Sequence, residues 1–304
     1  MSAMVALLGS RVVSGVAARL TRSRARAVAY HGIEDPTAFA AQLDHFCASG
    51  YRTITGRQLA DSLAGGAPLP DRALWLTFDD GDASVVHHGL PLLRERGMVA
   101  TAFLCGAWVG SDDAPWWQVL EAAVAPSELV ATRLALKRSP DIERRRRIDQ
   151  MQQALTTAGT PVVGRQWSAA DVREWLAVGN EVGNHSFDHP CLDRCDGDEQ
   201  RRQVRLAHER LSEVVGSAVD VFAWPNGDAS SAALDELRAL GYRLAADCNH
   251  RLVARHADAL AVSRLRLDTS VGLGRTRAIV SGAHSMVFHL QRRIRGGGES
   301  HAVT

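Results

Sequence analysis

Lysine is almost absent from this sequence. Lys137 is the only one, so the other 34 of the 35 basic residues are arginine. We interpret this bias mainly as the codon usage of a GC-rich genome. The alternative, in which the arginines recognise phosphate groups, stays open.

Long apolar runs and an excess of one charge are also missing. No stretch of about 20 apolar residues occurs, so the sequence predicts no membrane-spanning helix. The 35 basic and 34 acidic residues give a formal net charge of +1, so the overall charge does not indicate nucleic acid as a partner. Hydrophobic residues at 46% and charged residues at 23% are typical of a globular protein with a sizeable core.

Cysteine is scarce, and its five positions are scattered and odd in number. This pattern is not a disulfide framework, and it indicates free thiols in a reducing compartment. One close pair, Cys191 and Cys195, follows a segment with two histidines, which raises the alternative of a structural zinc site. A tetrahedral site of that spacing would be strained, and a closed site would leave no room for a substrate.

The first 20 residues lack the features of a signal peptide. No basic residue precedes their apolar part, Arg11 and Arg19 interrupt it, and no clear cleavage site follows. We therefore expect a cytoplasmic protein. The aliphatic residues of this stretch recur at helical spacing and arginines follow them: Val5, Leu8, Val12, Val16 and Leu20, then Arg22, Arg24 and Arg26. We expect residues 1–25 to form an amphipathic helix or arm, which either packs on the protein body or makes a peripheral contact with a membrane surface.

The rest of the chain alternates between short apolar runs and helical patterns. Several runs are continuously apolar, as in strands covered on both faces. This alternation predicts an α/β fold with a parallel sheet, either open or closed into a barrel. The expected strands span residues 27–30, 51–55, 74–78, 99–104, 181–184, 219–224, 242–246 and 261–267. The expected helices span residues 36–49, 84–96, 168–178, 198–215 and 230–240.

Residues 107–166 interrupt this alternation. They contain Trp116 and Trp117, then four arginines at 144–147, and no good strand. We expect a helical insertion in which the arginine run is a solvated helix face rather than a ligand site. One domain over residues 26–290 would carry this insertion at about 107–166, and the Gly-rich residues 291–304 would form a disordered tail.

Two adjacent carboxylates end one of the expected strands. The run 74–78 leads into Asp79, Asp80 and Gly81. Neighbouring side chains of a strand point to opposite faces, but a turn at Gly81 lets both carboxylates reach one pocket. In barrels the carboxyl ends of the strands carry the active site. A capped strand-to-helix turn is the other interpretation, since Asp and Gly are common there.

Two histidines four residues apart follow another expected strand. His185 and His189 come directly after the run 181–184. On one helical turn their imidazoles would lie on the same side and could share a metal ion, whereas taken alone they could be a pair of surface histidines. With one carboxylate of the Asp79–Asp80 pair they would form a common three-ligand catalytic site with positions open for water. The second Asp would then be free for proton transfer.

Two further strand ends carry aromatic or polar residues. The run 219–223 leads into Trp224, Pro225, Asn226 and a glycine, which fix a turn that can present a backbone N–H to a ligand. Trp224 could be a flat wall on which a sugar stacks, or a core residue of a plain turn. His31 stands at the end of the first expected strand, where a single histidine is usually only a polar loop residue.

Together these segments resemble the NodB-homology polysaccharide deacetylase family. Residues 77–81, Thr-Phe-Asp-Asp-Gly, are similar to its first motif, and residues 185–189, His-Ser-Phe-Asp-His, to its second, H-[ST]-x-x-H. The resemblance covers roughly residues 27–106 and 167–268. The Tyr-His pair at 30–31 and the Phe-Ala-Trp-Pro-Asn-Gly segment at 222–227 resemble the branch that acts on poly-N-acetylglucosamine and related exopolysaccharides.

The resemblance implies a distorted (β/α)7 TIM-like barrel and a hydrolase that removes N-acetyl groups from an N-acetylated sugar, either a polysaccharide or a lipid-linked glycan precursor. It implies that Asp80, His185 and His189 bind a divalent metal, for which we expect Zn²⁺, with Co²⁺, Ni²⁺ or Mn²⁺ as the other candidates. It also implies that Asp79 is the general base.

The remaining roles depend on where this sequence departs from the family pattern. Many relatives take their general acid from a later Leu-x-His motif, but the matching residues 264–268 read Arg-Leu-Arg-Leu-Asp. We assign the acid to His31, as in the branch with an early Tyr-His pair. Arg264 is our candidate for the arginine that orients the base in many relatives. The backbone N–H of Asn226, beside Trp224 and Pro225, would stabilise the oxyanion.

Rival functions stay open. The same site could act on an O-acetyl ester or a formamide of a sugar. A non-catalytic carbohydrate-binding barrel is a rival of another class, but it would be expected to have lost the base or a ligand, and all four side chains are present. The expected partner is an N-acetylated carbohydrate, with no nucleic acid.

Overall fold

Nine parallel strands form one sheet in the computed structural model, which describes residues 7–285. The strand order is β8-β7-β6-β5-β4-β3-β1-β9, and β2 pairs with β3 outside this path. Their bounds are β1 Arg26–Tyr30, β2 Arg52–Thr53, β3 Ala73–Phe78, β4 Thr101–Leu104, β5 Glu181–Asn184, β6 Val221–Ala223, β7 Leu244–Asp247, β8 Val262–Ser263 and β9 Leu265–Arg266. Residues 1–6 and the predicted tail 291–304 lie outside the described residues.

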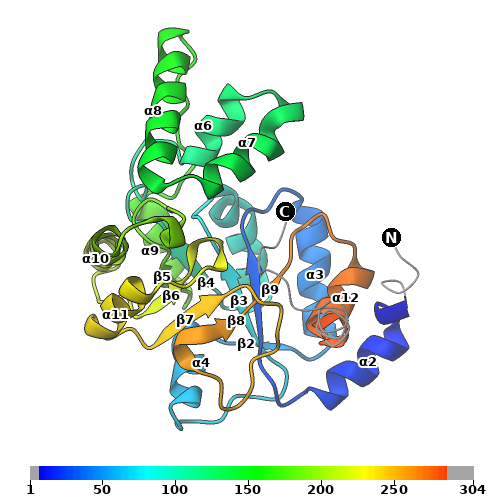
Figure 1. Cartoon of the computed structure of the whole chain (residues 1–304). Helices are drawn as coiled ribbons and strands as arrows, with labels where there is room; N and C mark the ends of the chain where they lie inside the picture. Colours follow the sequence, from blue (N-terminus) through cyan, green and yellow to red (C-terminus); the bar gives the residue numbers. More distant parts are fainter. Residues whose placement is uncertain (1–6, 286–304) are drawn as a thin grey trace, which may run out of the picture.

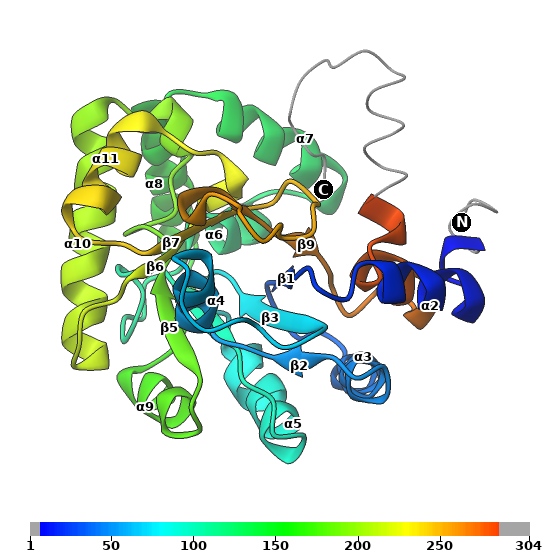
Figure 2. The ribbon, with the colours of Figure 1, turned by 90° about the horizontal axis from the view of Figure 1, so that it is seen from below.

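The sheet closes on itself around Arg264. β8 and β9 lie at opposite ends of the strand order, although only Arg264 separates them in sequence. The Arg264 N–H donates to the carbonyl of Asp247 (3.1 Å) on one side, and the Leu267 N–H donates to the carbonyl of Ala29 (3.0 Å) on the other. The predicted distorted (β/α)7 TIM-like barrel is therefore confirmed as a nearly closed barrel of parallel strands with helices around it (Figures 1 and 2).

Helices connect the strands and cover the outside of the barrel. Four predicted helices are observed, as α3 (Pro36–Ala48), α9 (Ala169–Ala177), α10 (Gly197–Val215) and α11 (Ser231–Ala239). Two more, α4 (Gly56–Leu63) and α12 (Leu273–Val280), were not predicted. Gly216 ends α10 in the left-handed region at φ 78°, which a glycine adopts without steric cost.

Two predicted elements are split. The strand expected at 261–267 is interrupted at Arg264, because the chain changes partner there from β7 to β1. The helix expected at 84–96 begins as a π-helix, η1 (Val85–Gly89), and continues as α5 (Leu90–Glu95). Pro91 lies in the first turn of α5, where a residue without an N–H is tolerated. Because proline has no N–H to donate, it cannot continue the hydrogen-bond pattern of the π-helix before it.

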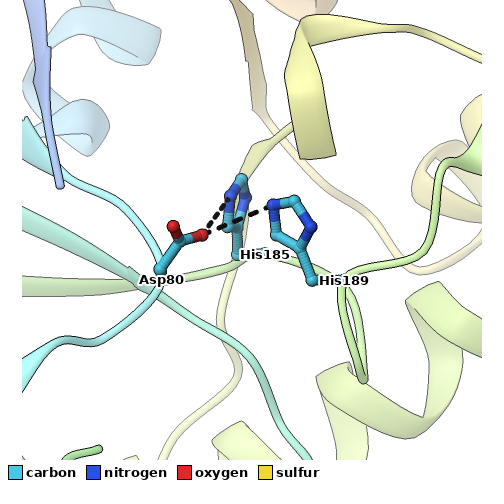
Figure 3. A group of neighbouring side chains, drawn as sticks. All are labelled: Asp80, His185 and His189. Atoms are coloured by element: carbon cyan, nitrogen blue, oxygen red, sulfur yellow. Dashed lines mark ion pairs between the residues drawn. The ribbon is translucent and has the colours of Figure 1, made fainter. Parts of the chain in front are cut away.

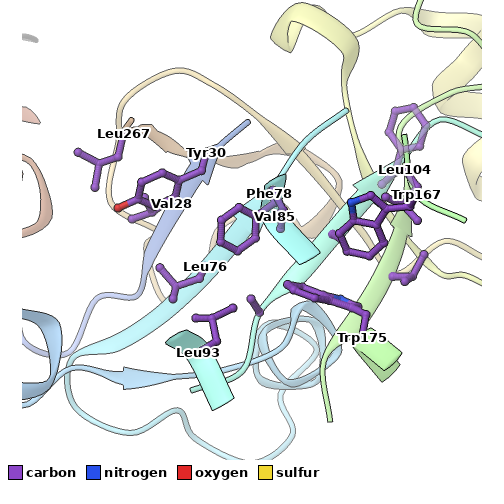
Figure 4. Close-up of a cluster of buried hydrophobic side chains, with 14 of the residues drawn as sticks. Val28, Tyr30, Leu76, Phe78, Val85, Leu93, Leu104, Trp167, Trp175 and Leu267 are labelled. Carbon is purple, nitrogen blue, oxygen red and sulfur yellow. The ribbon is translucent and has the colours of Figure 1, made fainter. Parts of the chain in front are cut away.

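The core of the barrel has two parts, divided by the sheet. Alternate strand residues such as Tyr30, Leu76 and Phe78 face outward and pack under the helices with Trp167 and Trp175 (Figure 4). Their neighbours face inward and fill the barrel, mainly as Ala27, Trp75, Phe103, Val221, Ala223 and Leu244. The period-two alternation places this inner set on the opposite face of the sheet.

Helix α4 closes the amino-terminal end of the barrel. The Glu181 carboxylate, at the start of β5, accepts the N–H groups of Gly56 (2.7 Å) and Arg57 (3.1 Å) and the hydroxyl of Thr101 (2.6 Å). A Cβ at Gly56 would lie 2.8 Å from the Glu181 carboxylate, so this contact requires glycine. The carboxyl ends of the strands are thereby left as the open mouth.

Three helices occupy the segment for which a helical insertion was predicted. They are α6 (Trp116–Ala123), α7 (Pro126–Arg138) and α8 (Asp141–Thr157), and they stand above the barrel in Figure 1. The prediction of a solvated arginine face was wrong for part of the run. The Arg144 side chain is 3% exposed, pairs with Asp141 (2.6 Å) and lies over the Trp116 ring. The predicted domain limits stay a prediction.

The described part of the N-terminal arm contains helix α2 (Arg11–Leu20), which lies beside α12 at the edge of the barrel (Figure 2). Ser10 caps it by accepting the N–H of Val13. Across residues 7–285, no helix combines the length and the apolar character needed to cross a bilayer.

Candidate active site

Asp79 and Asp80 follow β3 at the open mouth of the barrel. Asp80 and Gly81 both have a positive φ, 71° and 75°, so the chain turns sharply there. This turn brings both carboxylates to one pocket, as predicted from the glycine. Across the described residues, six non-glycine residues have a positive φ, and Asp80, Ser186, His189 and Asn226 all belong to this region. Such backbone costs of order 1–3 kcal/mol per residue, so the surrounding contacts must hold it in place.

His185 and His189 are also brought together, but not on a helical turn as predicted. The chain from His185 to His189 is irregular and passes through left-handed conformations at Ser186 (φ 69°) and His189 (φ 52°). The Gln203 amide oxygen on α10 accepts the N–H groups of Phe187 and Asp188, each at 3.0 Å. The loop is therefore fixed by tertiary hydrogen bonds where a helix ladder was expected.

The two imidazoles converge on Asp80. Its Oδ1 atom lies 3.3 Å from His185 Nε2 and 3.4 Å from His189 Nε2 (Figure 3). Across the described residues, Asp80, His185 and His189 are the group that could hold a metal ion, with ligand atoms within 4.8 Å of one another. Asp80 Oδ1 is buried without a hydrogen-bond partner, as expected for an atom whose partner is an ion. The His185 Nδ1 atom lies 2.8 Å from the Ala223 carbonyl; donation from Nδ1 leaves Nε2 free to bind.

Burial and neighbouring charges set the protonation of this group. Burial lowers the pKa of His189 to about 3, so its imidazole is neutral and able to act as a ligand. For Asp80, burial alone would raise the pKa, but His189, His185 and His31 together hold it well below its usual range. The donor set, two imidazoles and one carboxylate, fits a divalent ion such as Zn²⁺.

Asp79 is bound by Arg264 and lies beside the ligands, with its Oδ2 atom 4.0 Å from His185 Nε2. The guanidinium donates to both carboxylate oxygens, at 2.6 Å and 2.8 Å, and also to the Thr77 hydroxyl at 2.9 Å. Arg264 is fully buried and lies over the Phe103 ring. Burial alone would raise the pKa of Asp79, but Arg264 and His185 outweigh it and lower this pKa, so the carboxylate stays ionised. The predicted pairing of Arg264 with Asp79 is thus present.

The remaining predicted residues lie around this centre. The His31 Nε2 atom is 4.0 Å from Asp80 Oδ2, and its side chain is 56% exposed at the mouth. Pro225 and Asn226 form the turn η3 (Pro225–Gly227) after β6, and the Asn226 side chain lies 3.5 Å from Cys191 Sγ, next to the histidine loop. Trp224 is 1% exposed and packs edge-on against Phe222, so it is the core residue that the sequence left as an alternative. A buried indole offers no wall for sugar stacking.

Comparison with known proteins identifies the family. A family model described as polysaccharide deacetylase matches residues 66–245, more than half of the chain. The chain belongs to the polysaccharide deacetylase family. This confirms the predicted family and enzyme class.

Individual relatives of this chain are distant. A poly-β-1,6-N-acetyl-D-glucosamine N-deacetylase of Escherichia coli (strain K12) is 25% identical over 236 residues, which are 71% of this chain and 32% of that protein. This chain thus spans about a third of the length of that curated relative. This match is consistent with the predicted branch.

Solved structures show the same fold. IcaB from Ammonifex degensii has a TM-score of 0.61 at 20% identity, over 85% of this chain and 97% of that chain. The Streptococcus pyogenes deacetylase PplD, in complex with acetate, has a TM-score of 0.61 at 16% identity, over 83% and 96% of the two chains.

Contacts between the insertion and the histidine loop were not predicted from the sequence. Arg145 on α8 donates to both carboxylate oxygens of Asp188 (2.5 Å and 2.8 Å) and pairs with Glu199 (3.1 Å). The Trp116 indole N–H donates to the His189 carbonyl at 3.1 Å. Asp188 lies inside the second motif, and no role was predicted for it. An unassigned carboxylate between the two histidines is the one signal that could have suggested a partner for the arginine run.

The ligand set predicts which substitutions remove the metal. Asp80→Ala or His189→Ala should weaken Zn²⁺ binding by about 100-fold or more, because even residues that only orient ligands are worth about 10–100-fold. Zn²⁺ content after loading and desalting, with a chelator competition assay, measures this. Cys191→Ser and Cys195→Ser should retain Zn²⁺, and loss of the metal in those two variants instead would place it at the cysteines.

Proposed function

We propose that this chain hydrolyses the acetamide group of an N-acetylated sugar in a reaction that requires a divalent metal, with Zn²⁺ as the expected ion. The observation that carries the proposal is the position of Asp79. Its ionised carboxylate accepts two hydrogen bonds from Arg264 and lies beside the cluster of Asp80, His185 and His189. A carboxylate that is not needed as a ligand is available to accept a proton.

The chain's own side chains supply the acid–base steps. Asp80, His185 and His189 would hold a divalent ion, which would polarise the carbonyl oxygen of the acetamide and make a water molecule more acidic. Asp79 accepts a proton from the attacking water. The backbone N–H of Asn226, in the turn beside the histidine loop, stabilises the developing oxyanion. His31, partly exposed at the mouth, donates a proton to the departing amine, and each such step is typically worth about 10²–10⁴-fold.

The substrate class follows from the family and the curated relative. That relative is named for poly-β-1,6-N-acetyl-D-glucosamine. We propose a polysaccharide or a lipid-linked glycan precursor with N-acetylated sugars as the substrate of this chain. An O-acetyl ester or a formamide presents a similar carbonyl, so the acyl group and the linking atom require direct assay.

Acyl release tests the proposal. Zn²⁺-loaded enzyme should release acetate from an N-acetylglucosamine oligomer, whereas Asp79→Asn should lose activity by about 100-fold or more while retaining Zn²⁺. Acetate release from an O-acetylated sugar and formate release from an N-formylated sugar serve as the comparison reactions. Preference for either comparison substrate would contradict N-deacetylation, and full activity of Asp79→Asn would remove Asp79 from the mechanism.

The Arg264–Asp79 pair predicts a shift in pH dependence. In Arg264→Gln the guanidinium no longer offsets the burial of Asp79, so the pKa of its carboxyl should rise. A general base works only when deprotonated, so the acid limb of kcat/KM for acetate release should move to higher pH. Arg243→Gln, which removes an exposed arginine paired with Asp61, should keep the wild-type limb. An unmoved limb in Arg264→Gln would show that Arg264 does not set the ionisation of Asp79.

A further inference from the structure

Helix α2 packs against the barrel through small residues and turns its larger aliphatic residues to solvent. Its buried residues are Ser14, Ala17 and Ala18. On the other side of the helix, Val12 is 77%, Val16 56% and Leu20 79% exposed. These three residues stand at i, i+4 and i+8, so they form one stripe along the helix, here called the outer stripe. An ordinary amphipathic helix would bury such a stripe.

Contacts at both ends fix the side of α2 that faces the barrel. At the amino end, Arg277 on α12 donates from its Nε atom to the Gly9 carbonyl at 2.9 Å. A Cβ at Gly9 would overlap the Gly274 carbonyl oxygen, so the two backbones touch there. At the carboxyl end, the Thr21 hydroxyl donates to the Ser281 carbonyl at 3.1 Å. The helix therefore cannot rotate about its axis and bury the outer stripe without breaking these contacts.

The buried residue Arg26, at the start of β1, strengthens the contact at the carboxyl end. Its guanidinium donates to the carbonyls of Val280 (2.9 Å), Thr21 (2.8 Å) and Arg24 (2.6 Å). A buried charge needs such partners, so the end of α2, the first strand and the end of α12 are held together. The outer stripe is thus part of a fixed surface of the molecule.

The chain around α2 is basic. Its first 33 residues contain five arginines and no acidic residue. Arg11, Arg19 and Arg24 are exposed and belong to no ion pair found among residues 7–285. Arg22 lies 3.4 Å from Asp71, but both side chains are more than half exposed, and such pairs contribute little. The charge beside the outer stripe is therefore positive and largely uncompensated.

Two of these arginines lie along one border of the outer stripe. Seven residues are almost two turns of an α-helix, so Arg19 lies next to Val12 around the helix. Arg11 lies toward the same side, about 12 Å along the axis from Arg19. Gly15, between them, is exposed, and a Cβ at this position would meet open space. The exposed half of α2 thus combines an apolar stripe with a basic border.

This combination complements a surface of anionic lipid. Helices of this kind lie in the plane of the interface, with the aliphatic side chains at the acyl chains and the cations at the head groups. A second copy of the chain is less suited, because an antiparallel pair of α2 helices would set Arg11 against Arg19. We propose that α2 binds the surface of a membrane that contains anionic lipid, through the outer stripe and the exposed arginines beside it.

The proposed contact leaves the candidate active site uncovered. α2 leads into the start of β1, so its carboxyl end lies at the end of the barrel opposite to the mouth. The insertion, which stands above the mouth, lies away from α2 in Figures 1 and 2. Binding to vesicles and hydrolysis of a water-soluble sugar can therefore be measured independently of each other.

Sedimentation with vesicles tests the proposal. The protein should sediment with vesicles of phosphatidylcholine mixed with phosphatidylglycerol, less with phosphatidylcholine alone, and less at high salt, because salt screens the arginines. The triple variant Val12→Ser, Val16→Ser, Leu20→Ser should lower the partition coefficient by about 100-fold or more, since burial of each aliphatic side chain is worth about 10-fold. Its Tm should stay near that of the wild type, because the replaced side chains are exposed.

A second triple variant is the matched control. Val130→Ser, Ile142→Ser, Val163→Ser replaces aliphatic residues of the insertion that are 56%, 80% and 61% exposed, and it should sediment as the wild type does.

Further variants separate the charge from the apolar area. Arg11→Gln, Arg19→Gln should weaken binding to the mixed vesicles by about 25-fold, about 5-fold for each arginine, and should change binding to phosphatidylcholine little. Arg138→Gln, Arg146→Gln, at exposed positions of α7 and α8, is its control and should bind as the wild type does. Gly15→Leu should strengthen binding by about 10-fold. Gly15→Ala, which also favours the helix but adds little apolar area, should bind nearly as the wild type does.

The outcomes separate this proposal from the reaction. Failure of the wild type to sediment with the mixed vesicles, or equal sedimentation of the two triple variants, would overturn it. Equal binding to both kinds of vesicle would show that anionic lipid is not the partner, and a dimer that the α2 triple variant dissociates would show that a second copy is. Acetate release from a soluble N-acetylglucosamine oligomer should be unchanged in the α2 triple variant. If the wild type releases none, the proposed function fails, whereas sedimentation still decides the role of α2.

Discussion

The buried ion pair between Arg264 and Asp79 is the contact on which both the barrel and the site depend. Arg264 is the single residue between β8 and β9, so its backbone lies where the two ends of the sheet meet. Its guanidinium donates to both Asp79 oxygens and to the Thr77 hydroxyl, which satisfies much of the desolvated charge. A buried pair is tolerated only with such complete hydrogen bonding, and removing one partner typically costs about 3–5 kcal/mol. The closure of the fold and the ionisation of Asp79 therefore depend on the same residue, the first through its backbone and the second through its guanidinium.

The ligands are positioned by loops whose backbone would not adopt these conformations alone. Asp80, Ser186, His189 and Asn226 all have a positive φ. Hydrogen bonds from rigid elements compensate this strain: the Ser186 N–H, for example, donates to the Asn184 side chain at the end of β5 (2.7 Å). Rigid strands and helices thus hold an irregular chain in a geometry that suits an ion, as is common for sites at the carboxyl ends of barrel strands.

Local patterns in the sequence were sufficient for the strands, most helices and the residues that meet at the mouth. The adjacent pair Asp79 and Asp80 before a glycine predicted a shared pocket, because a turn at Gly81 can bring neighbouring strand residues to the same side. Arg264 was found only through a resemblance, and its place at the seam of the barrel could not be predicted, because the partner change from β7 to β1 is a property of the closed sheet. The histidine loop was expected as a helical turn for a similar reason: the Gln203 side chain, which accepts the N–H groups of Phe187 and Asp188 in place of a helix ladder, lies 16 and 15 residues away in sequence.

The arginine run at residues 144–147 is a second case in which contacts between distant parts of the chain could not be predicted from the sequence. Its composition alone indicated a solvated surface, but Arg144 is buried against Trp116 and Arg145 reaches the histidine loop. Long-range partners of this kind cannot be read from charge patterns, because each arginine in the run has the same local sequence signal. Trp224 is the opposite case, in which the strand-end position was right and only its burial was undetermined.

The contacts of α6 and α8 with the histidine loop have a thermodynamic consequence. Trp116 donates to the His189 carbonyl and Arg145 clamps Asp188, so the three-helix insertion and the ion pocket share one loop. Linkage is reciprocal: if docking of these helices improves the ion's affinity by some factor, the bound ion favours docking by that same factor. Diversification of the insertion during evolution would then change the strength with which the ion is held as well as the shape of the sugar that enters.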